Sequence, residues 1–148
     1  MHDKDELEAV EILLVEDNPA HADMMRETLK ESRIANRLSV VTDGEMALDF
    51  LYRKGQFAEA PRPGLILLDL GLPRKTGLEV LSEIKEEPEL RRIPVIVLTT
   101  SKSEEDILKS YDLHANTFIS KPVRLSDFME VIRSLENYWF VMAQLPRS

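Results

Sequence analysis

The chain has 148 residues, of which 43% are hydrophobic and 31% charged, an ordinary mix for a soluble globular domain. Its 19 basic and 27 acidic side chains give a net charge of −8, which argues against nucleic acid as a partner, because phosphate backbones bind basic surfaces. There is no apolar run of the roughly 18 residues that a membrane span needs, the polar start does not resemble a secretory signal, and the lack of cysteine excludes disulfide and thiolate chemistry and suits the cytoplasm.

Short apolar runs rich in Val, Ile and Leu alternate along the chain with longer segments of helical spacing. The runs predict strands at Glu11–Val15, Leu38–Val41, Leu65–Leu68, Val95–Leu98 and Thr117–Ile119. The longer segments predict helices at Ala20–Ser32, Gly44–Lys54, Gly77–Glu86, Glu104–Asp112 and Leu125–Met142. This alternation is typical of an α/β fold, a doubly wound five-stranded parallel sheet with helices on both faces.

The chain shows no internal repeat, low-complexity tract or linker. We therefore expect a single domain over residues 1–148, with a flexible leader at 1–9 and a C-terminal extension at 137–148.

Polar side chains follow four of the predicted strands, at the edge where open α/β sheets bind ligands. Glu16 and Asp17 follow the first strand, Asp69 the third and Thr99 the fourth, and Lys121 comes just after the fifth. Taken singly, each has an ordinary interpretation, since an Asp after a strand often caps the next helix and a Lys before Pro is commonly a surface residue. Their occurrence together at one sheet edge predicts a functional site.

Charge repulsion indicates what this site binds. Neighbouring carboxylates repel one another by about 4 kcal/mol per pair at about 4 Å and an effective dielectric near 20. A fold keeps such a cluster where a cation occupies it, and oxygen ligands without His or Cys favour Mg²⁺ over zinc. The ion also binds phosphoryl oxygens and so lowers the barrier to attack by a carboxylate. Lys121 and the Thr99 hydroxyl offer further contacts to those oxygens.

The same residues resemble the motifs of receiver domains in bacterial response regulators, over about Glu11 to Leu135. The matching motifs are Leu13–Asp17, Leu67–Pro73 with Gly77, Pro94–Thr99, and Phe118–Pro122. The resemblance implies a flavodoxin-like or CheY-like sheet with strand order 2-1-3-4-5, here with an extended C-terminal helix.

The resemblance also implies a metal site and a phosphoacceptor. Asp69 is the expected phosphoacceptor, and the expected cofactor is Mg²⁺ or Mn²⁺. The implied ligands are Asp17 and Asp69 directly, Glu16 through a water, and the backbone carbonyl of Gly71.

A second implied set of residues responds to phosphorylation. Thr99 is the expected switch hydroxyl and Lys121 the expected phosphate-binding residue. Phe118 is the expected switch aromatic, although an ordinary core aromatic is its alternative interpretation. The Lys121–Pro122 peptide bond is expected to be cis.

These features predict a two-component response regulator that accepts its phosphoryl group from a sensor histidine kinase. Such a protein is not an enzyme with a separate substrate, although it catalyses its own phosphotransfer and dephosphorylation. A narrower resemblance, to single-domain regulators paired with phytochrome kinases of cyanobacteria and other bacteria, points to a light-sensing partner. It is carried by Tyr52–Phe57, Pro61–Pro63, Glu89–Pro94, Leu98–Ser101 and Asn137–Trp139.

The predicted last helix is apolar all round at Tyr138–Met142, unlike an ordinary surface helix. Either this segment folds back on its own core or it forms a partner interface. We favour a homodimer through this helix, with Phe128, Tyr138 and Trp139 as candidate contacts.

Some positions depart from the family pattern and leave the phosphoryl lifetime open. Thr76 stands where the family usually has Asp or Asn, and Gly71 and Ser101 are small residues beside the site. Two alternatives remain: a binding module that works without phosphorylation, and an aspartyl-phosphate hydrolase. The hydrolase is disfavoured because Gly71 occupies the place of its general acid. His21 is expected to be a solvated residue on the first helix, close to the site.

Overall fold

The computed structural model describes residues 9–32, 34–100 and 117–133. Its sheet has five strands in the order β2-β1-β3-β4-β5, and every neighbouring pair is parallel. The predicted doubly wound sheet with order 2-1-3-4-5 is confirmed. The strands are β1 (Val10–Val15), β2 (Asn36–Val41), β3 (Leu65–Asp69), β4 (Val95–Thr99) and β5 (Thr117–Ser120).

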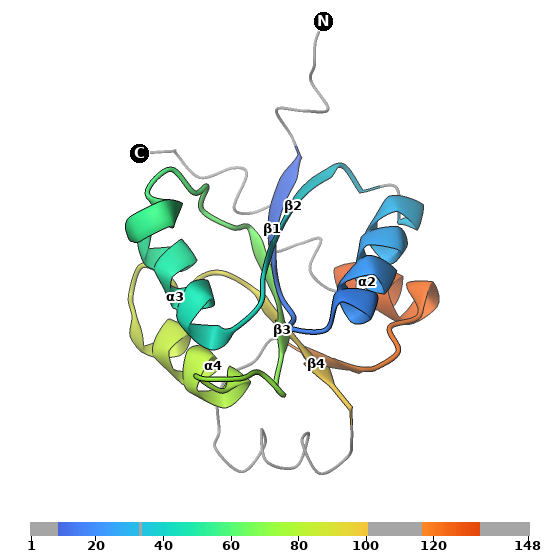
Figure 1. Cartoon of the computed structure of the whole chain (residues 1–148). Coiled ribbons are helices and arrows are strands. Elements are labelled where there is room, and N and C mark those ends of the chain that lie inside the picture. The colour runs from blue at the N-terminus through green and yellow to red at the C-terminus, as the bar shows by residue number, and fades with distance from the viewer. Residues whose placement is uncertain (1–8, 33, 101–116, 134–148) are drawn as a thin grey trace, which may run out of the picture.

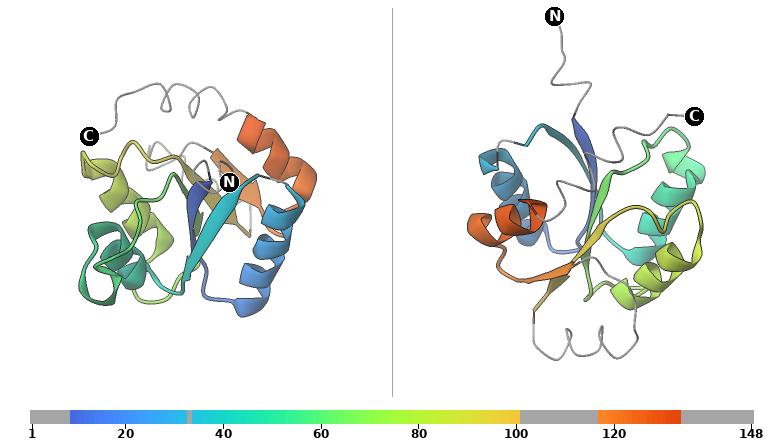
Figure 2. Two further views of the ribbon diagram at one scale, coloured as in Figure 1. Left: turned by 90° about the horizontal axis from the view of Figure 1, so that it is seen from above. Right: turned by 180° about the vertical axis from the view of Figure 1, so that it is seen from behind.

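Helices cover both faces of the sheet, as right-handed crossovers require (Figures 1 and 2). On one face lie α3 (Gly44–Tyr52) and α4 (Gly77–Glu86), with a short 3₁₀ turn, η1 (Gly55–Phe57), after α3. On the other lie α2 (Pro19–Glu31) and a helix over residues 125–133. None of the helices in these described ranges combines the length and the apolar character of a membrane span.

Several predicted features lie outside the described residues. They are the helix at Glu104–Asp112, the end of the last helix with Tyr138 and Trp139, nearly all of the leader, and the C-terminal extension.

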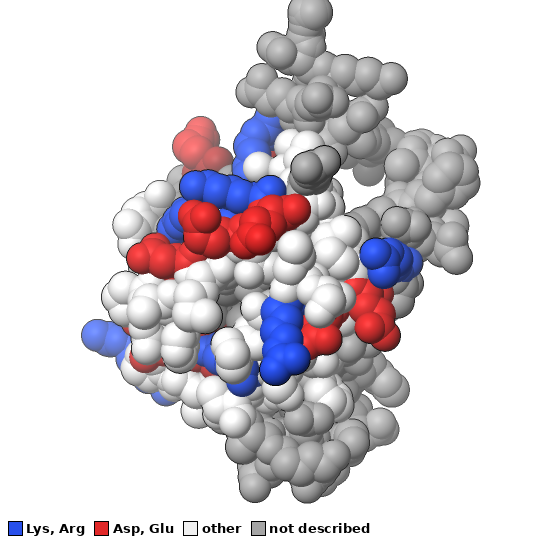
Figure 3. Space-filling view, turned by 90° about the vertical axis from the view of Figure 1, so that its right-hand side faces the viewer, with Lys and Arg blue, Asp and Glu red and all other residues white. Residues whose placement is uncertain are grey.

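On the outward face of α2 and the 125–133 helix, acidic and basic side chains are interspersed, so this face carries no single sign of charge (Figure 3).

Local sequence sets where the helices begin. Asn18 caps α2 by accepting hydrogen bonds from two backbone N–H groups, and Pro19 occupies the first turn, where its missing N–H costs nothing. Asp43 caps α3 by accepting a hydrogen bond from the backbone N–H of Met46. Thr76 caps α4 in a reciprocal capping box with Glu79. Thr76, one of the departures from the family pattern, therefore has a structural function.

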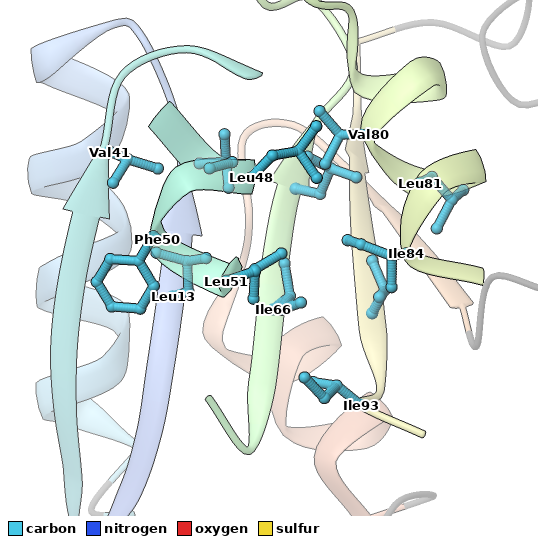
Figure 4. Close-up of a cluster of buried hydrophobic side chains, with 14 of the residues drawn as sticks. Leu13, Val41, Leu48, Phe50, Leu51, Ile66, Val80, Leu81, Ile84 and Ile93 are labelled. Carbon is cyan, nitrogen blue, oxygen red and sulfur yellow. The ribbon is translucent and has the colours of Figure 1, made fainter. Parts of the chain in front are cut away.

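The core consists of two layers, one on each face of the sheet. Leu13 and Val15 of β1 face the layer of α3 and α4, whereas Ile12 and Leu14 face the layer of α2 and the 125–133 helix. All residues of β3 and β4 are buried, which explains why their sequences are apolar up to the last residue of each strand, Asp69 and Thr99. Figure 4 shows the first layer, with Leu13 and Ile66 from the strands and Leu48, Phe50, Leu51, Val80, Leu81 and Ile84 from α3 and α4.

The loop between β3 and α4 packs closely on the start of α3. A Cβ atom at Gly44 would overlap the backbone carbonyl of Lys75, so only glycine allows this approach. Arg74, with a positive φ of 64°, reaches back to Asp43 at 3.7 Å and to Glu45 at 3.6 Å. The loop that follows Asp69 is thus held against a second helix.

Gly44→Ala tests this contact. We expect the free energy of unfolding to fall by about 1–3 kcal/mol, because the overlap is with backbone that must shift. Urea denaturation measures the change. Gly64→Ala is the matched control, since the nearest atom to its added Cβ is a side-chain carbon of Val10 at 3.5 Å. Equal stability of the two variants would contradict the prediction.

Candidate functional site

Four strands bring the predicted polar residues to one edge of the sheet. Asp69 ends β3 and Thr99 ends β4, while Glu16 and Asp17 follow β1 directly. Lys121 follows β5, and its backbone N–H donates to the Thr99 carbonyl at 2.7 Å. Parallel strands end on the same side, so these residues meet even though they are distant in sequence.

Three of them form an acidic cluster: Glu16, Asp17 and Asp69 each place a carboxylate oxygen within 4.8 Å of the others. Glu16 is 2% exposed and Asp69 is 5% exposed, whereas Asp17 faces solvent. The Asn18 N–H donates to Glu16 at 3.1 Å and the Gly71 N–H donates to Asp69 at 3.3 Å. Because Asn18 caps α2, the carboxylate of Asp17 is not used as a cap.

Lys121 supplies the positive charge that faces this cluster. Its ammonium lies 2.5 Å from a Glu16 carboxylate oxygen and 3.4 Å from one of Asp69, and its side chain is 10% exposed. The Lys121–Pro122 peptide bond is cis. One ammonium against the three carboxylates of the acidic cluster leaves two negative charges. The donors are all oxygens and the excess charge is that of a divalent ion, so these residues fit Mg²⁺ or Mn²⁺.

The electrostatics of Asp69 also favour an incoming cation. Burial raises the pKa of Asp69, and the negative charge of Glu16 raises it further. Lys121 and the Gly71 N–H act in the opposite direction, but the net shift is upward. The ionised form of Asp69 is therefore disfavoured in the protein alone, and a cation beside it would relieve that cost.

Thr99 carries an unsatisfied polar group at the same edge. Its side chain is fully buried, and its hydroxyl has no hydrogen-bond partner among the described residues. An unpaired buried hydroxyl costs about 1–3 kcal/mol. Asp69 pairs with Leu98 in the sheet, which places Thr99 one residue beyond the register of Asp69. The hydroxyl is thus a donor available to a ligand bound at this sheet edge.

Two other predicted residues lie within the fold. Phe118 on β5 is partly buried and packs against the layer of α3 and α4. Phe128, a candidate dimer contact, is 1% exposed and belongs to the opposite core layer. Its side chain packs in this core layer, so it has almost no exposed surface with which to contact a partner.

The structure adds one residue whose contact sequence reasoning missed. His21 is partly solvated and close to the site, as predicted, with a side chain that is 41% exposed. Its Nδ1 nevertheless lies 3.1 Å from the Lys121 ammonium and 3.8 Å from a Glu16 carboxylate oxygen. The only signal in the sequence was its place soon after Glu16-Asp17, because Lys121 lies 100 positions away along the chain.

Residues 12–133 match the family described as response regulator receiver domain. The response regulator Rcp1 of Synechocystis sp. is 47% identical over 135 residues, which are 91% of this chain and 92% of Rcp1.

Solved structures agree with this match. A Mn²⁺-bound form of Rcp1 is 46% identical with a TM-score of 0.74, over 93% of this chain and 99% of that one. The phosphorylated cyanobacterial phytochrome response regulator RcpA is 46% identical with a TM-score of 0.75, over 94% of this chain and 99% of that one. The bacteriophytochrome response regulator RtBRR is 42% identical with a TM-score of 0.81, over 86% of this chain and 78% of that one.

Asp69→Asn tests the charge balance of the metal-free protein. A raised folded-state pKa means that the contribution of Asp69 to stability is fully present below its ordinary value of 3.8 and is lost as pH rises through the folded value. We therefore expect the variant to be more stable than the native protein at about pH 7, with a gain that shrinks toward about pH 4. Lys121 keeps its contact with Glu16 in the variant.

Urea denaturation in EDTA at both pH values measures this gain. Asp49→Asn, at an exposed position of α3, is the matched control and should change stability little at either pH. An Asp69→Asn protein that is less stable than the native protein at neutral pH would refute the view that the ionised carboxylate is costly.

Proposed function

The chain belongs to the response regulator receiver family, and from this premise we propose that it is a cytoplasmic two-component regulator that accepts a phosphoryl group on Asp69. The observation that carries the proposal is the meeting of the acidic cluster, Lys121 and the Thr99 hydroxyl at one sheet edge. Asp69 is the one carboxylate of the cluster that contacts Lys121 and also lies in the register next to Thr99.

We propose that Asp17 and Asp69 hold Mg²⁺ or Mn²⁺ directly, Glu16 through a water, and Gly71 through its backbone carbonyl. The oxygen-only donor set and the two uncompensated negative charges support this assignment. When bound, the ion neutralises charge on the phosphoryl oxygens.

The residues of this chain then have separate tasks in the transfer. A carboxylate oxygen of Asp69 forms the new bond to phosphorus, and the bond from phosphorus to the donor group breaks, so that the donor leaves with the bonding electron pair. The ammonium of Lys121, already 3.4 Å from Asp69, contacts a phosphoryl oxygen. The Thr99 hydroxyl donates to another, and thereby gains the partner that it lacks among the described residues. No second carboxylate follows Asp69 at Gly71, which supports a phosphoacceptor rather than a hydrolase.

The consequence of transfer is a shift between two conformations. A phosphoryl group adds roughly −1.5 to −2 charges and three strong acceptor oxygens. Moving a population from 1:99 to 99:1 requires about 5.5 kcal/mol of differential stabilisation. Contacts to Thr99 and Lys121 would contribute to it, and Phe118, only partly buried on β5, is the proposed element that responds.

The partner that we propose is a sensor histidine kinase of the phytochrome type. RcpA and RtBRR are described as phytochrome and bacteriophytochrome response regulators, and the resemblance covers most of this chain. Homodimerisation through the last helix remains a prediction from sequence, because Tyr138 and Trp139 lie outside the described residues.

Phosphorylation of Asp69 is tested by intact-mass spectrometry after incubation with acetyl phosphate and Mg²⁺. We expect the native chain to gain the mass of one phosphoryl group, and Asp69→Asn to gain none. EDTA should abolish the gain, because the metal neutralises the charge that opposes attack. An adduct of equal yield on Asp69→Asn would place the phosphoacceptor elsewhere.

Thr99→Val separates stability from signalling. Valine is similar in volume and lacks the unpaired hydroxyl, so we expect unphosphorylated protein of equal stability or more stable by up to about 1–3 kcal/mol. The phosphorylated variant should lose its phosphoryl group about tenfold faster, because one hydrogen bond to a charged group is missing. Urea denaturation and the decay of the mass adduct measure the two effects. Thr99→Ser, which keeps the hydroxyl, is the control for lifetime.

A further inference from the structure

His21 occupies a fixed position at the start of α2. Asn18 caps the helix and accepts from the His21 N–H at 3.3 Å, and Pro19 in the first turn restricts the backbone. The Asn18 N–H in turn donates to Glu16. The backbone of His21 is therefore tied to the segment that carries the acidic cluster, and its half-buried side chain turns toward Lys121.

The Lys121 ammonium has a contact for each of its N–H donors. It lies 2.5 Å from Glu16, 3.1 Å from the Nδ1 of His21 and 3.4 Å from Asp69. An ammonium only donates, so Nδ1 of His21 accepts and the ring proton is on Nε2. The Glu16 oxygen, at 3.8 Å from Nδ1, is beyond hydrogen-bond distance, so Lys121 is the hydrogen-bond partner of this nitrogen.

We propose that His21 is a positioning residue for phosphotransfer, whose imidazole holds the Lys121 ammonium within reach of Asp69. This inference rests on the function proposed above and adds a residue to it. Glu16 is the nearest contact of the ammonium at 2.5 Å, and Asp69 is farther away at 3.4 Å. Without His21 the shorter contact with Glu16 would dominate, and the ammonium would be less restrained beside Asp69. A lysine side chain has a long flexible stem, and a second anchor reduces the freedom that is lost when it binds a phosphoryl oxygen.

The chemistry of the contact defines the test variants. His21→Leu removes the acceptor, whereas His21→Asn places an amide oxygen close to the position of Nδ1. We expect the second-order rate constant for phosphorylation by acetyl phosphate with Mg²⁺ to fall about three- to tenfold in the Leu variant, the loss that one hydrogen bond gives. The Asn variant should keep a rate within about twofold of the native rate. Arg26→Leu, at an exposed position of the same helix, is the matched control and should behave like the native chain.

Lys121→Met removes the ammonium through which His21 is proposed to act, and so provides a background for a double-variant test. There, adding His21→Leu should cause no further loss of rate, because the ammonium that His21 positions is gone. The same fold loss in both backgrounds would overturn the inference, as would a Leu variant as fast as the native chain or an Asn variant as slow as the Leu variant.

A measurement without any phosphodonor tests the contact itself. The ¹⁵N chemical shifts of the His21 ring distinguish a bare from a protonated nitrogen, and we expect a bare Nδ1 that shifts in Lys121→Met. A protonated Nδ1 would overturn the inference and leave the proposed function intact. Failure of the native chain to gain a phosphoryl group would instead overturn the proposed function.

Discussion

Burial of two carboxylates against one ammonium is the interaction on which the rest of the site depends. Glu16 and Asp69 are almost inaccessible to solvent, and ions in such a place are stable only when they are paired and hydrogen-bonded. Lys121 contacts both, and so links the end of β5 to the ends of β1 and β3. The position of Lys121 depends on strand order, because the loops after these strands meet only when the strands pair in the order 2-1-3-4-5.

The site has two unfavourable features that a bound ligand would remove. Asp69 has a raised pKa because it is buried near Glu16, and Thr99 has a buried hydroxyl without a partner among the described residues. Both sit at the ends of strands that are buried along their whole length. The two apolar core layers stabilise the fold enough to compensate for these two destabilising groups at the sheet edge.

Local sequence patterns predicted what depends on neighbours along the chain. Strands β3 and β4 were predicted to within one residue because their apolar runs are continuous, whereas β2 begins two residues before the predicted Leu38, at polar Asn36. Arg37 on that stretch pairs with Glu11 on β1, a contact that hydrophobic periodicity does not register. The ordinary interpretation of Asp17 as the cap of the first helix was wrong, because Asn18, also a residue type that caps helices, caps α2. The contact of His21 with Lys121 could not be predicted from local sequence, because the residues are 100 positions apart and meet only through the placement of β5 in the sheet.

The packing around Asp69 differs between its two sides, and this difference determines where the proposed phosphorylation would act. On the side of α4, a Cβ at Gly77 would lie 2.5 Å from the Asp69 carbonyl, and the Gly77 N–H bonds to Leu70, so the loop after β3 is already closed. Its far end is held by Lys75 against Gly44. On the side of β4, by contrast, the Thr99 hydroxyl forms no hydrogen bond within the part of the chain that the structure describes. In the proposed mechanism, phosphoryl oxygens at Asp69 would therefore act on β4 and, through the Lys121 N–H that binds the Thr99 carbonyl, on the end of β5. Strand β5 at this edge carries Phe118, so we expect a change at Asp69 to shift β4 and β5 more readily than the tightly packed loop after β3.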